Sequence, residues 1–286
     1  MSLTPSPARE PITARQVLQM IIIAAVGLVF LLPLFWLTIS ALRPEDDIFR
    51  YLNPFGVWTF IPNRVTFANI AGLWTSAFAR AIFNSLFVSI ATVVFGLAVC
   101  APAAFALAVI DFPGRSAFFT VMIVSFLIPF DAIAVPLFDI MRSANLSNTY
   151  TGLILPGVGN GLAVFLLRQF FLAIPKELSE AAMVDGLGWY QIFFRIYLPL
   201  SAPALISAGL TMFIFQWQAF LWPLLIAPSN DMKVAAVALA QFSTEYNVSF
   251  GLLFAGAMFL SLIPMVILVG FQQYFTGSVA ATGSKE

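Results

Sequence analysis

The stretch IPKELSEAAMVDGLGWYQIFFRIYLPLSAP, residues 174–203, is a polar interruption between two long apolar segments. Pro175 is suited to the start of a helix, because its missing N–H group would have no partner in the first turn anyway. Glu177 and Glu180 follow in or near that turn, where the positive end of the helix dipole favours acidic side chains. The stretch therefore predicts a short helix within a loop.

Spacing indicates how this helix is arranged. Steps of three and four residues predict one shared face, made of Leu178, Ala181, Ala182 and Asp185. Gly186 and Gly188 suit a helix end that requires a left-handed residue, and a second amphipathic piece follows at 189–196. A face of small residues beside an acid fits close packing against another protein, whereas an amphipathic helix resting on lipid headgroups has the same pattern. The residues by themselves leave both interpretations open.

The flanking sequence places the loop in a membrane protein. Of 286 residues, 61% are apolar and only 9% are charged, against about 25% charged in soluble domains. A helix needs about 20 mostly apolar residues to cross the hydrocarbon core. Six stretches meet this requirement, which predicts an all-α integral membrane fold: they lie at about 17–41, 82–109, 117–140, 150–172, 202–227 and 251–275.

The six spans define a predicted domain and its orientation. The domain covers 17–275 and contains the loop at 173–201, with an N-terminal tail at 1–16 and a C-terminal tail at 276–286. The first apolar stretch is too long for a signal peptide core, which favours a retained helix. Arg9 and Arg15 precede it and favour a cytoplasmic N-terminus. Six crossings then place both termini and the loop in the cytoplasm. The predicted location is the plasma (inner) membrane of a bacterium or archaeon.

Composition also excludes several classes of chemistry. The chain has no histidine and a single cysteine, Cys100, so Ser–His catalysis and histidine-based metal sites are excluded. No phosphate-binding G-x-x-x-x-G-K-[ST] motif is present, which predicts a transport subunit with no ATPase site, no metal site and no cofactor of its own. A net charge of zero gives no indication of nucleic-acid binding.

The sequence of the loop resembles that of a known protein family. Fixed spacing from the E-A-A triplet to I-x-L-P is similar to the EAA signature of ABC importer permeases, and every position of that pattern is present: Glu180, Ala181, Ala182, Gly186, Ile196, Leu198 and Pro199. Most of the chain shares the resemblance, through NSL (84–86), FPGR (112–115), NLSNTYTGLILP (145–156) and FLLRQFFLAIPKELSEAAMVDG (165–186). It is most similar to carbohydrate-uptake permeases, in particular the six-span permease of the maltose importer.

The resemblance implies a mechanism and a set of partners. It implies the type I importer permease fold, with a cytoplasmic coupling helix between the fourth and fifth spans that includes Asp185 and seats in a cleft of a separate ATPase. That ATPase, present in two copies, would bind ATP and Mg²⁺. A second homologous permease chain would complete the pathway through the lipid bilayer. An external binding protein would deliver a sugar or related small solute, docking on the loops at 42–81 and 228–250.

Polar residues inside the spans are candidates for the solute pathway. Asp131 is the most prominent, because 1.5 Å per residue from position 117 places it about 21 Å into a core about 30 Å thick. An ionisable group at that depth is functional by default; the alternatives are a position nearer the outer interface or a partner-chain pair. The other candidates are Asn84, Gln216, Trp217 and Gln218, where helix packing is the competing interpretation. The family often has Trp-Asn where this chain has Trp217-Gln218.

Other functions remain as alternatives. Permeases for glycerol-phosphate esters or polyols would have similar sequences, and the scarcity of cationic residues within the spans weighs mildly against a phosphorylated substrate. An ion-coupled secondary transporter with Asp131 as its ion site is a second class, although such proteins generally have more spans and inverted repeats. A membrane-embedded hydrolase would have to rely on carboxylate or Ser–Lys chemistry, and Asp131 has no acidic companion deep in the same span.

Overall fold

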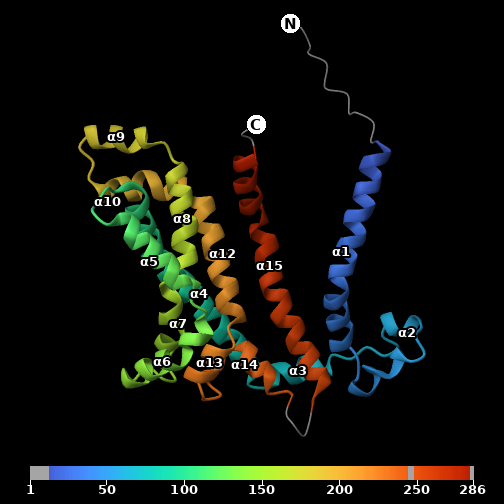
Figure 1. The fold of residues 1–286 in the computed structure, drawn as a ribbon. Helices are drawn as coiled ribbons and strands as arrows, with labels where there is room; N and C mark the ends of the chain where they lie inside the picture. Colours follow the sequence, from blue (N-terminus) through green and yellow to red (C-terminus); the bar gives the residue numbers. More distant parts are fainter. Residues whose placement is uncertain (1–12, 244–247, 284–286) are drawn as a thin grey trace.

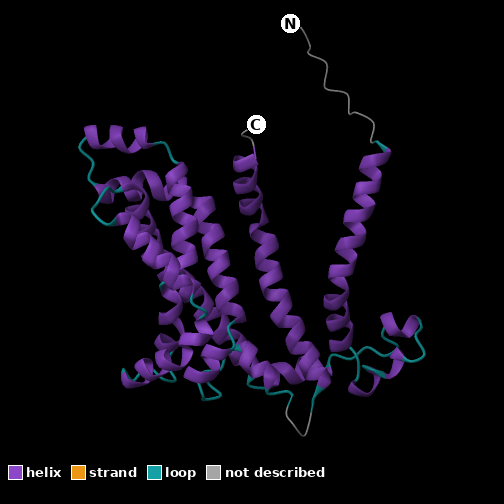
Figure 2. Cartoon of the chain, viewed as in Figure 1, coloured by secondary structure: helices purple, strands orange, loops and turns teal. Residues whose placement is uncertain are grey.

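The computed structural model describes residues 13–243 and 248–283, and every regular element in that part of the chain is a helix (Figures 1 and 2). Four short helical turns complete the α-helices: 3-10 turns at Glu45–Asp47 and Arg50–Leu52, a π-helical turn at Phe193–Tyr197, and α11 (Leu198–Leu200). The α-helices are α1 (Ala14–Ala41), α2 (Val57–Phe60), α3 (Ala68–Thr75), α4 (Phe78–Val109), α5 (Arg115–Leu127), α6 (Phe130–Ser143), α7 (Tyr150–Val158), α8 (Gly161–Ala173), α9 (Lys176–Val184), α10 (Trp189–Ile192), α12 (Ala202–Gln218), α13 (Leu221–Ile226), α14 (Ala235–Ala240) and α15 (Phe250–Gly283).

Three helices in the described ranges are long and apolar enough to cross a membrane by themselves: α1, α4 and α15. Three further pairs reach that length only together, and each pair is bent: α5 with α6 by 96°, α7 with α8 by 41°, and the α10–α11 segment with α12 by 79°. The predicted spans at 117–140, 150–172 and 202–227 are therefore not single helices but contain a bend or a break. The last of these ends at Gln218, and a separate helix, α13, follows.

The sharpest bend changes the interpretation of Asp131. Ile128 has extended backbone angles (φ −68°, ψ 121°), as residues before proline prefer because the proline ring crowds the α conformation. After Pro129 the chain turns into α6, which lies across the end of the molecule (Figure 1). Asp131 is in the first turn of α6 and is exposed. The depth of 21 Å was wrong because it assumed a straight helix.

The predicted tails also change. Residues 1–12 and 284–286 lie outside the described part of the chain, but α1 already begins at Ala14. Thr13 caps this helix: its side chain accepts from the Gln16 N–H, and the Gln16 side chain accepts from the Thr13 N–H at 2.8 Å. At the other end α15 continues to Gly283, so most of the predicted C-terminal tail at 276–286 is helical.

The core is organised around α4, which packs against α7, α8 and α12. One buried cluster surrounds Phe105 near the end of α4 and includes residues of α8, α9, the π-helical turn and α12. A second surrounds Phe78 at the start of α4 and includes residues of α3, α12, α14 and α15. The long helix thus connects the α9 end of the molecule to the opposite end.

Two tryptophan side chains donate hydrogen bonds to backbone carbonyls that prolines leave without a partner. Pro264 in α15 cannot donate to the carbonyl of Leu260, four residues earlier, and the indole Nε1–H of Trp217 donates to that carbonyl at 3.0 Å. In α7, Pro156 frees the carbonyl of Gly152 in the same way, and Trp222 donates to it at 3.0 Å. A freed carbonyl inside a membrane needs such a donor, because lipid offers none.

Replacing either tryptophan with phenylalanine is expected to destabilise the fold by about 1 kcal/mol, because the aromatic ring remains while a buried carbonyl loses its donor. Trp74→Phe is the matched control, since Trp74 is 47% exposed and contacts Phe259 edge-on. Thermal unfolding of the detergent-solubilised protein measures the effect. Equal midpoints for Trp222→Phe and Trp74→Phe would show that the carbonyl does not depend on the indole.

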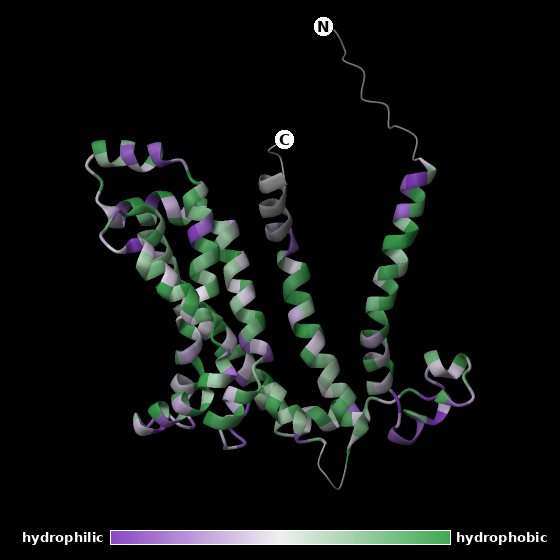
Figure 3. Ribbon diagram, viewed as in Figure 1, coloured by the Kyte–Doolittle hydropathy of each residue, from purple (hydrophilic) through white to green (hydrophobic). Residues whose placement is uncertain are grey.

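Two ends of the molecule are distinct (Figure 1). The first turn of α1, the last turn of α15 and helix α9 lie at one end, whereas α2, α3, α6, α13 and α14 lie at the other. The bundle between them is mostly hydrophobic, and hydrophilic residues gather towards the ends (Figure 3). The described ends of α1 and α15 thus lie at the same end of the molecule as α9, whereas residues 1–12 and 284–286 of the predicted tails lie outside the described part of the chain.

Candidate coupling site

Helix α9 is a nine-residue helix at the edge of the molecule, connected to α8 by Ile174 and Pro175 (Figure 1). Pro175 is the residue that precedes its first turn, as expected, and Glu177 lies in that turn. The buried Ser179 hydroxyl donates to the Lys176 carbonyl at 2.7 Å. The short polar helix predicted within the loop is present.

Gly186 ends the helix with a left-handed conformation, φ +82°. Its N–H donates to the Met183 carbonyl at 3.0 Å, and the Leu187 N–H donates to the Ala182 carbonyl at 3.0 Å. These two bonds form a Schellman motif, which satisfies carbonyls that the helix end would otherwise leave free. The second predicted candidate, Gly188, has φ −79° and instead precedes α10, so that part of the prediction was wrong.

The structure separates the four residues of the predicted shared face of α9, leaving three exposed and one buried. Ser179 and Ala182 are buried, at 4% and 6% exposure. Because successive helical residues are about 100° apart, positions 177, 180, 181 and 184 point outwards, and Val184 is 89% exposed. Leu178, Ala181 and Asp185 are exposed on a flank of this outward face. Ala182 differs from the prediction, because it does not share this exposed face but belongs to the interior cluster around Phe105.

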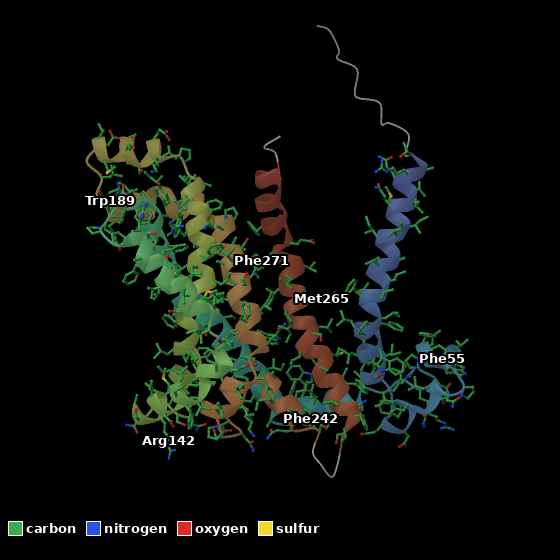
Figure 4. The ribbon with its side chains drawn as sticks, viewed as in Figure 1. Phe55, Arg142, Trp189, Phe242, Met265 and Phe271 are labelled. Atoms are coloured by element: carbon green, nitrogen blue, oxygen red, sulfur yellow. The ribbon has the colours of Figure 1, made fainter. Side chains whose placement is uncertain are left out.

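An aromatic cluster supports the loop from beneath. Phe105 of α4 contacts Phe193 and Tyr197 of the π-helical turn at ring-centroid distances of 5.2 and 5.0 Å, and Phe171 of α8 at 6.2 Å. Trp189 in α10 completes the cluster at 6.4 Å from Phe105 (Figure 4). These rings join segment 189–197 to α4 and α8, and Ala182 of α9 belongs to the same buried cluster.

The later positions of the signature lie in this support. Ile196 and Leu198 are half-buried and pack against the cluster, while Pro199 in α11 is exposed. Glu180, Ala181 and Gly186 lie on or beside the outward surface. The eight predicted coupling residues therefore fall into two groups. Those that pack in or against the cluster are Ala182, Ile196 and Leu198, and those that are exposed are Glu180, Ala181, Asp185, Gly186 and Pro199.

Sequence reasoning missed several exposed apolar residues of this surface. Val184 ends α9, and Tyr190 and Phe194 of the following segment are 76% and 45% exposed, with their rings 4.6 Å apart. The spacing of Glu177, Glu180 and Val184 could have indicated this surface, because these residues recur at steps of three and four. The predicted face at 178, 181, 182 and 185 has the same spacing, so the pattern fits both. Only the positions of Phe105 and Phe171 decide between the two faces.

Asn84, a predicted pathway residue, is part of the interior instead. Its amide is fully buried and donates to the carbonyls of Asp231 and Lys233 at 2.8 and 2.9 Å, and it accepts from the Tyr150 hydroxyl at 2.8 Å. Both amide protons are thus used to hold the segment before α14 against α4. Asn84 thus has a structural role in this conformation, which favours the helix-packing interpretation over contact with solute.

The other pathway candidates separate around α12. Gln216 packs towards α7, where its Oε1 lies 2.8 Å from the position a side chain at Gly157 would occupy. Trp217 is buried, and its indole donates to the Leu260 carbonyl. Gln218 is exposed and, with Trp217, lines a cavity of about 520 Å³ between α1, α12, α14 and α15. Met265 of α15 also lines this cavity (Figure 4). Asp131 is not among its lining residues.

Comparison with known proteins identifies the family. Residues 100–280 match the family model described as binding-protein-dependent transport system inner membrane component. The chain is 36% identical to the arabinooligosaccharides transport system permease protein AraQ of Halalkalibacterium halodurans, over 92% of this chain and 94% of that protein. It is 31% identical to the sn-glycerol-3-phosphate transport system permease protein UgpE of Yersinia pestis, over 86% of this chain and 89% of that protein. It is 27% identical to the lactose transport system permease protein LacG of Rhizobium radiobacter, over 91% and 93%.

Solved structures show the same fold. A chain of a bacterial ABC transporter that imports the acidic polysaccharide alginate superposes with a TM-score of 0.75 at 22% identity, covering 94% of this chain and 99% of that chain. A chain of the MetNI methionine ABC transporter, in an inward-facing conformation, gives a TM-score of 0.55 over 71% and 95% at 19% identity. The fold is that of an ABC importer permease, and the chain belongs to the family of binding-protein-dependent transport system inner membrane components.

Proposed function

We propose that this permease forms half of the translocation pathway of an ATP-driven importer and that α9 is its coupling helix. The observation that carries the proposal is the geometry of α9: a helix capped by a left-handed glycine, exposed on its outer face and held on its inner face by aromatic rings of α4 and α8. A lipid-resting helix needs no rigid support of this kind. A helix that transmits force from an ATPase does.

The same proposal gives the topology. Helices α1, α4, α12 and α15 and the bent pairs α5–α6 and α7–α8 each count as one crossing. Six crossings then make up the permease domain at 17–275, with the cytoplasmic loop at 173–201, which includes α10 and α11, between the fourth and fifth. The ends of α1 and α15 that lie beside α9 are then cytoplasmic (Figure 1). Two ATPase subunits bind ATP and Mg²⁺ on that side, and a second homologous permease completes the pathway.

The loops at the opposite end are proposed to receive the binding protein. Loop 42–81 and loop 228–250 meet there: Glu45 Oε1 accepts from the Phe250 N–H at 2.8 Å, and the rings of Phe49 and Phe250 are 4.8 Å apart. Part of the second loop, 244–247, lies outside the described residues. The contact between the two loops supports a single combined docking surface.

We propose a sugar or sugar-derived solute as the substrate. Relatives named for arabinooligosaccharide and lactose transport support this class, whereas the UgpE relative keeps glycerol-phosphate esters as the second candidate. In this chain Trp217 and Gln218 would offer an aromatic edge and an amide to the 520 Å³ cavity. No Lys or Arg lines that cavity, which favours an uncharged solute.

Co-expression of the chain with its transporter partners tests the function. We expect a tagged form to co-purify with an ATPase and a second permease, and proteoliposomes to take up solute only with ATP inside and binding protein outside. The solute is found first by thermal-shift screening of the binding protein against sugars, polyols and glycerol phosphates. Uptake by this chain alone, driven by a proton or sodium gradient, would contradict the proposal and favour a secondary transporter.

A further inference from the structure

The loop after α1 carries an uncovered apolar surface, which we name the α2 patch. No described residue of the chain covers it, although its five members are 43–70% exposed: Phe55, Val57, Trp58, Phe60 and Ile61. The rings of Phe55 and Phe60 contact each other edge-on at 5.4 Å. Clusters of this kind in a folded protein mark an interaction surface.

The outward direction of the α2 patch is enforced by polar contacts on the opposite side of the same backbone. Arg43 is 1% exposed, and its Nη2 donates to the carbonyls of Trp58 and Thr59 at 2.7 and 2.9 Å. The buried Thr59 hydroxyl donates to the Tyr51 carbonyl and accepts from the Gly56 N–H at 3.1 Å. Because these bonds hold the backbone from within, the apolar side chains are left on the outside.

A network of arginines around one aspartate stabilises the loop that carries the α2 patch. The buried Asp47 carboxylate accepts from Arg64 Nε at 2.8 Å and lies 3.6 Å from Arg50 Nη1. Burial lowers the pKa of Arg43, and the nearby Asp47 carboxylate opposes that shift. The Arg50 and Arg64 side chains are 64% and 59% exposed despite these contacts, so the outer side of each guanidinium group remains accessible at the two ends of the stretch 51–61, which has no charged residue.

The position of the α2 patch relates it to the membrane. Helix α2 does not project beyond α1 but lies level with its last turns, on the side away from α15 (Figure 1), and Phe55 is at the outer edge of the molecule (Figure 4). Helix α1 is a candidate span with none of its most apolar window buried inside the molecule. The patch therefore lies at the level of the last turns of a helix whose exposed apolar surface suits the bilayer.

We propose that the α2 patch is seated in the headgroup–acyl boundary of the bilayer leaflet opposite α9. Aromatic side chains favour this zone, because it accepts both an apolar ring and a polar edge. The flanking Arg50 and Arg64 are suited to phosphate oxygens of lipid headgroups. The binding-protein contact proposed above is then left to the other residues of loops 42–81 and 228–250, because an uncharged aromatic surface level with α1 does not suit a position in water.

Site-directed spin labelling of the whole transporter tests this proposal. In a Cys100→Ala background, Phe55→Cys and Ile61→Cys carry nitroxides on the patch, and Asp46→Cys is a water-facing control on the same loop, since Asp46 is exposed. The transporter is reconstituted in vesicles of phosphatidylethanolamine and phosphatidylglycerol. Collisions with oxygen, which concentrates in lipid, are compared with collisions with a water-soluble nickel chelate, and a lipid with a labelled acyl chain is the reference.

The expected result at positions 55 and 61 is high oxygen access with severalfold lower nickel access than at position 46, close to the lipid reference. High nickel access at both positions would overturn the proposal and assign the patch to water or to a binding protein. Low access to both reagents would overturn it in favour of a second protein chain. None of these outcomes depends on transport activity, so the test is independent of the function proposed above.

Discussion

Gly186→Val is expected to abolish ATP-driven uptake while the chain still inserts and assembles in the membrane. Gly186 has φ +82°, a conformation that a β-branched residue avoids. Holding valine there would cost about 1–3 kcal/mol, and the alternative is to give up the Schellman bonds to Met183 and Ala182. A nine-residue helix has little stability of its own, so α9 would lose its defined end and orientation.

The size of the effect follows from those energies. A penalty of about 1–3 kcal/mol reduces the population of the correctly positioned helix by roughly 5–150-fold. Uptake requires repeated engagement of that helix, so transport would fall towards background. The strain is confined to the loop surface, where a side chain at position 186 would meet no atom within 4 Å, and the membrane helices do not depend on it.

Gly188→Val is the matched control. It lies two residues away and also has open space around the position of a side chain, but its φ is −79°. The same substitution is therefore expected to retain uptake. Gly186→Asn should recover part of the activity, since asparagine tolerates left-handed angles better than valine. Proteoliposome uptake and ATPase rate, normalised to inserted protein, are the measurements; equal loss at 186 and 188 would contradict the conformational argument.

The contrast between these two glycines also shows what could be predicted from the sequence. A helix at 176–184 with a glycine end is a local property, set by Pro175, the acidic first turn and Gly186. Which glycine adopts the left-handed angle depends on where the last turn closes, and Ala182 and Leu187 decide this by packing against distant rings. Ala182 was assigned to the outer face for the same reason, because the rings that bury it belong to α4 and α8.

Hydropathy similarly located the apolar segments but not their bends. Residues 117–140 are apolar enough for one span, yet Ile128 before Pro129 is extended and the segment bends by 96°. A window average contains no information on direction, so Asp131 was placed at the wrong depth. Prolines gave a usable signal in two other places: Pro264 and Pro156 each implied a free carbonyl, although nothing local indicated Trp217 and Trp222 as the donors.

Val184→Glu is expected to remove the ATPase from the purified complex. Val184 is 89% exposed at the end of α9 and lies on the same outward face as Glu180. In the proposed coupling contact this apolar side chain would be covered by the partner, and an unpaired carboxylate in its place would cost about 1–3 kcal/mol or more. The ATPase would then dissociate roughly 5–150-fold more readily, enough for loss during affinity purification in detergent.

The substitution is not expected to destabilise the free chain, because a carboxylate at this exposed position remains in water. Loss of ATPase docking can therefore be distinguished from loss of folding. Val184→Thr keeps the shape and adds no charge, so it should retain most of the ATPase. Glu180→Lys tests the charge on the same face and is expected to abolish uptake by placing a cation against a groove that favours an acid. Retention of ATPase and uptake in both Val184→Glu and Glu180→Lys would return α9 to the interpretation as a lipid-resting helix, since a headgroup contact would tolerate either change.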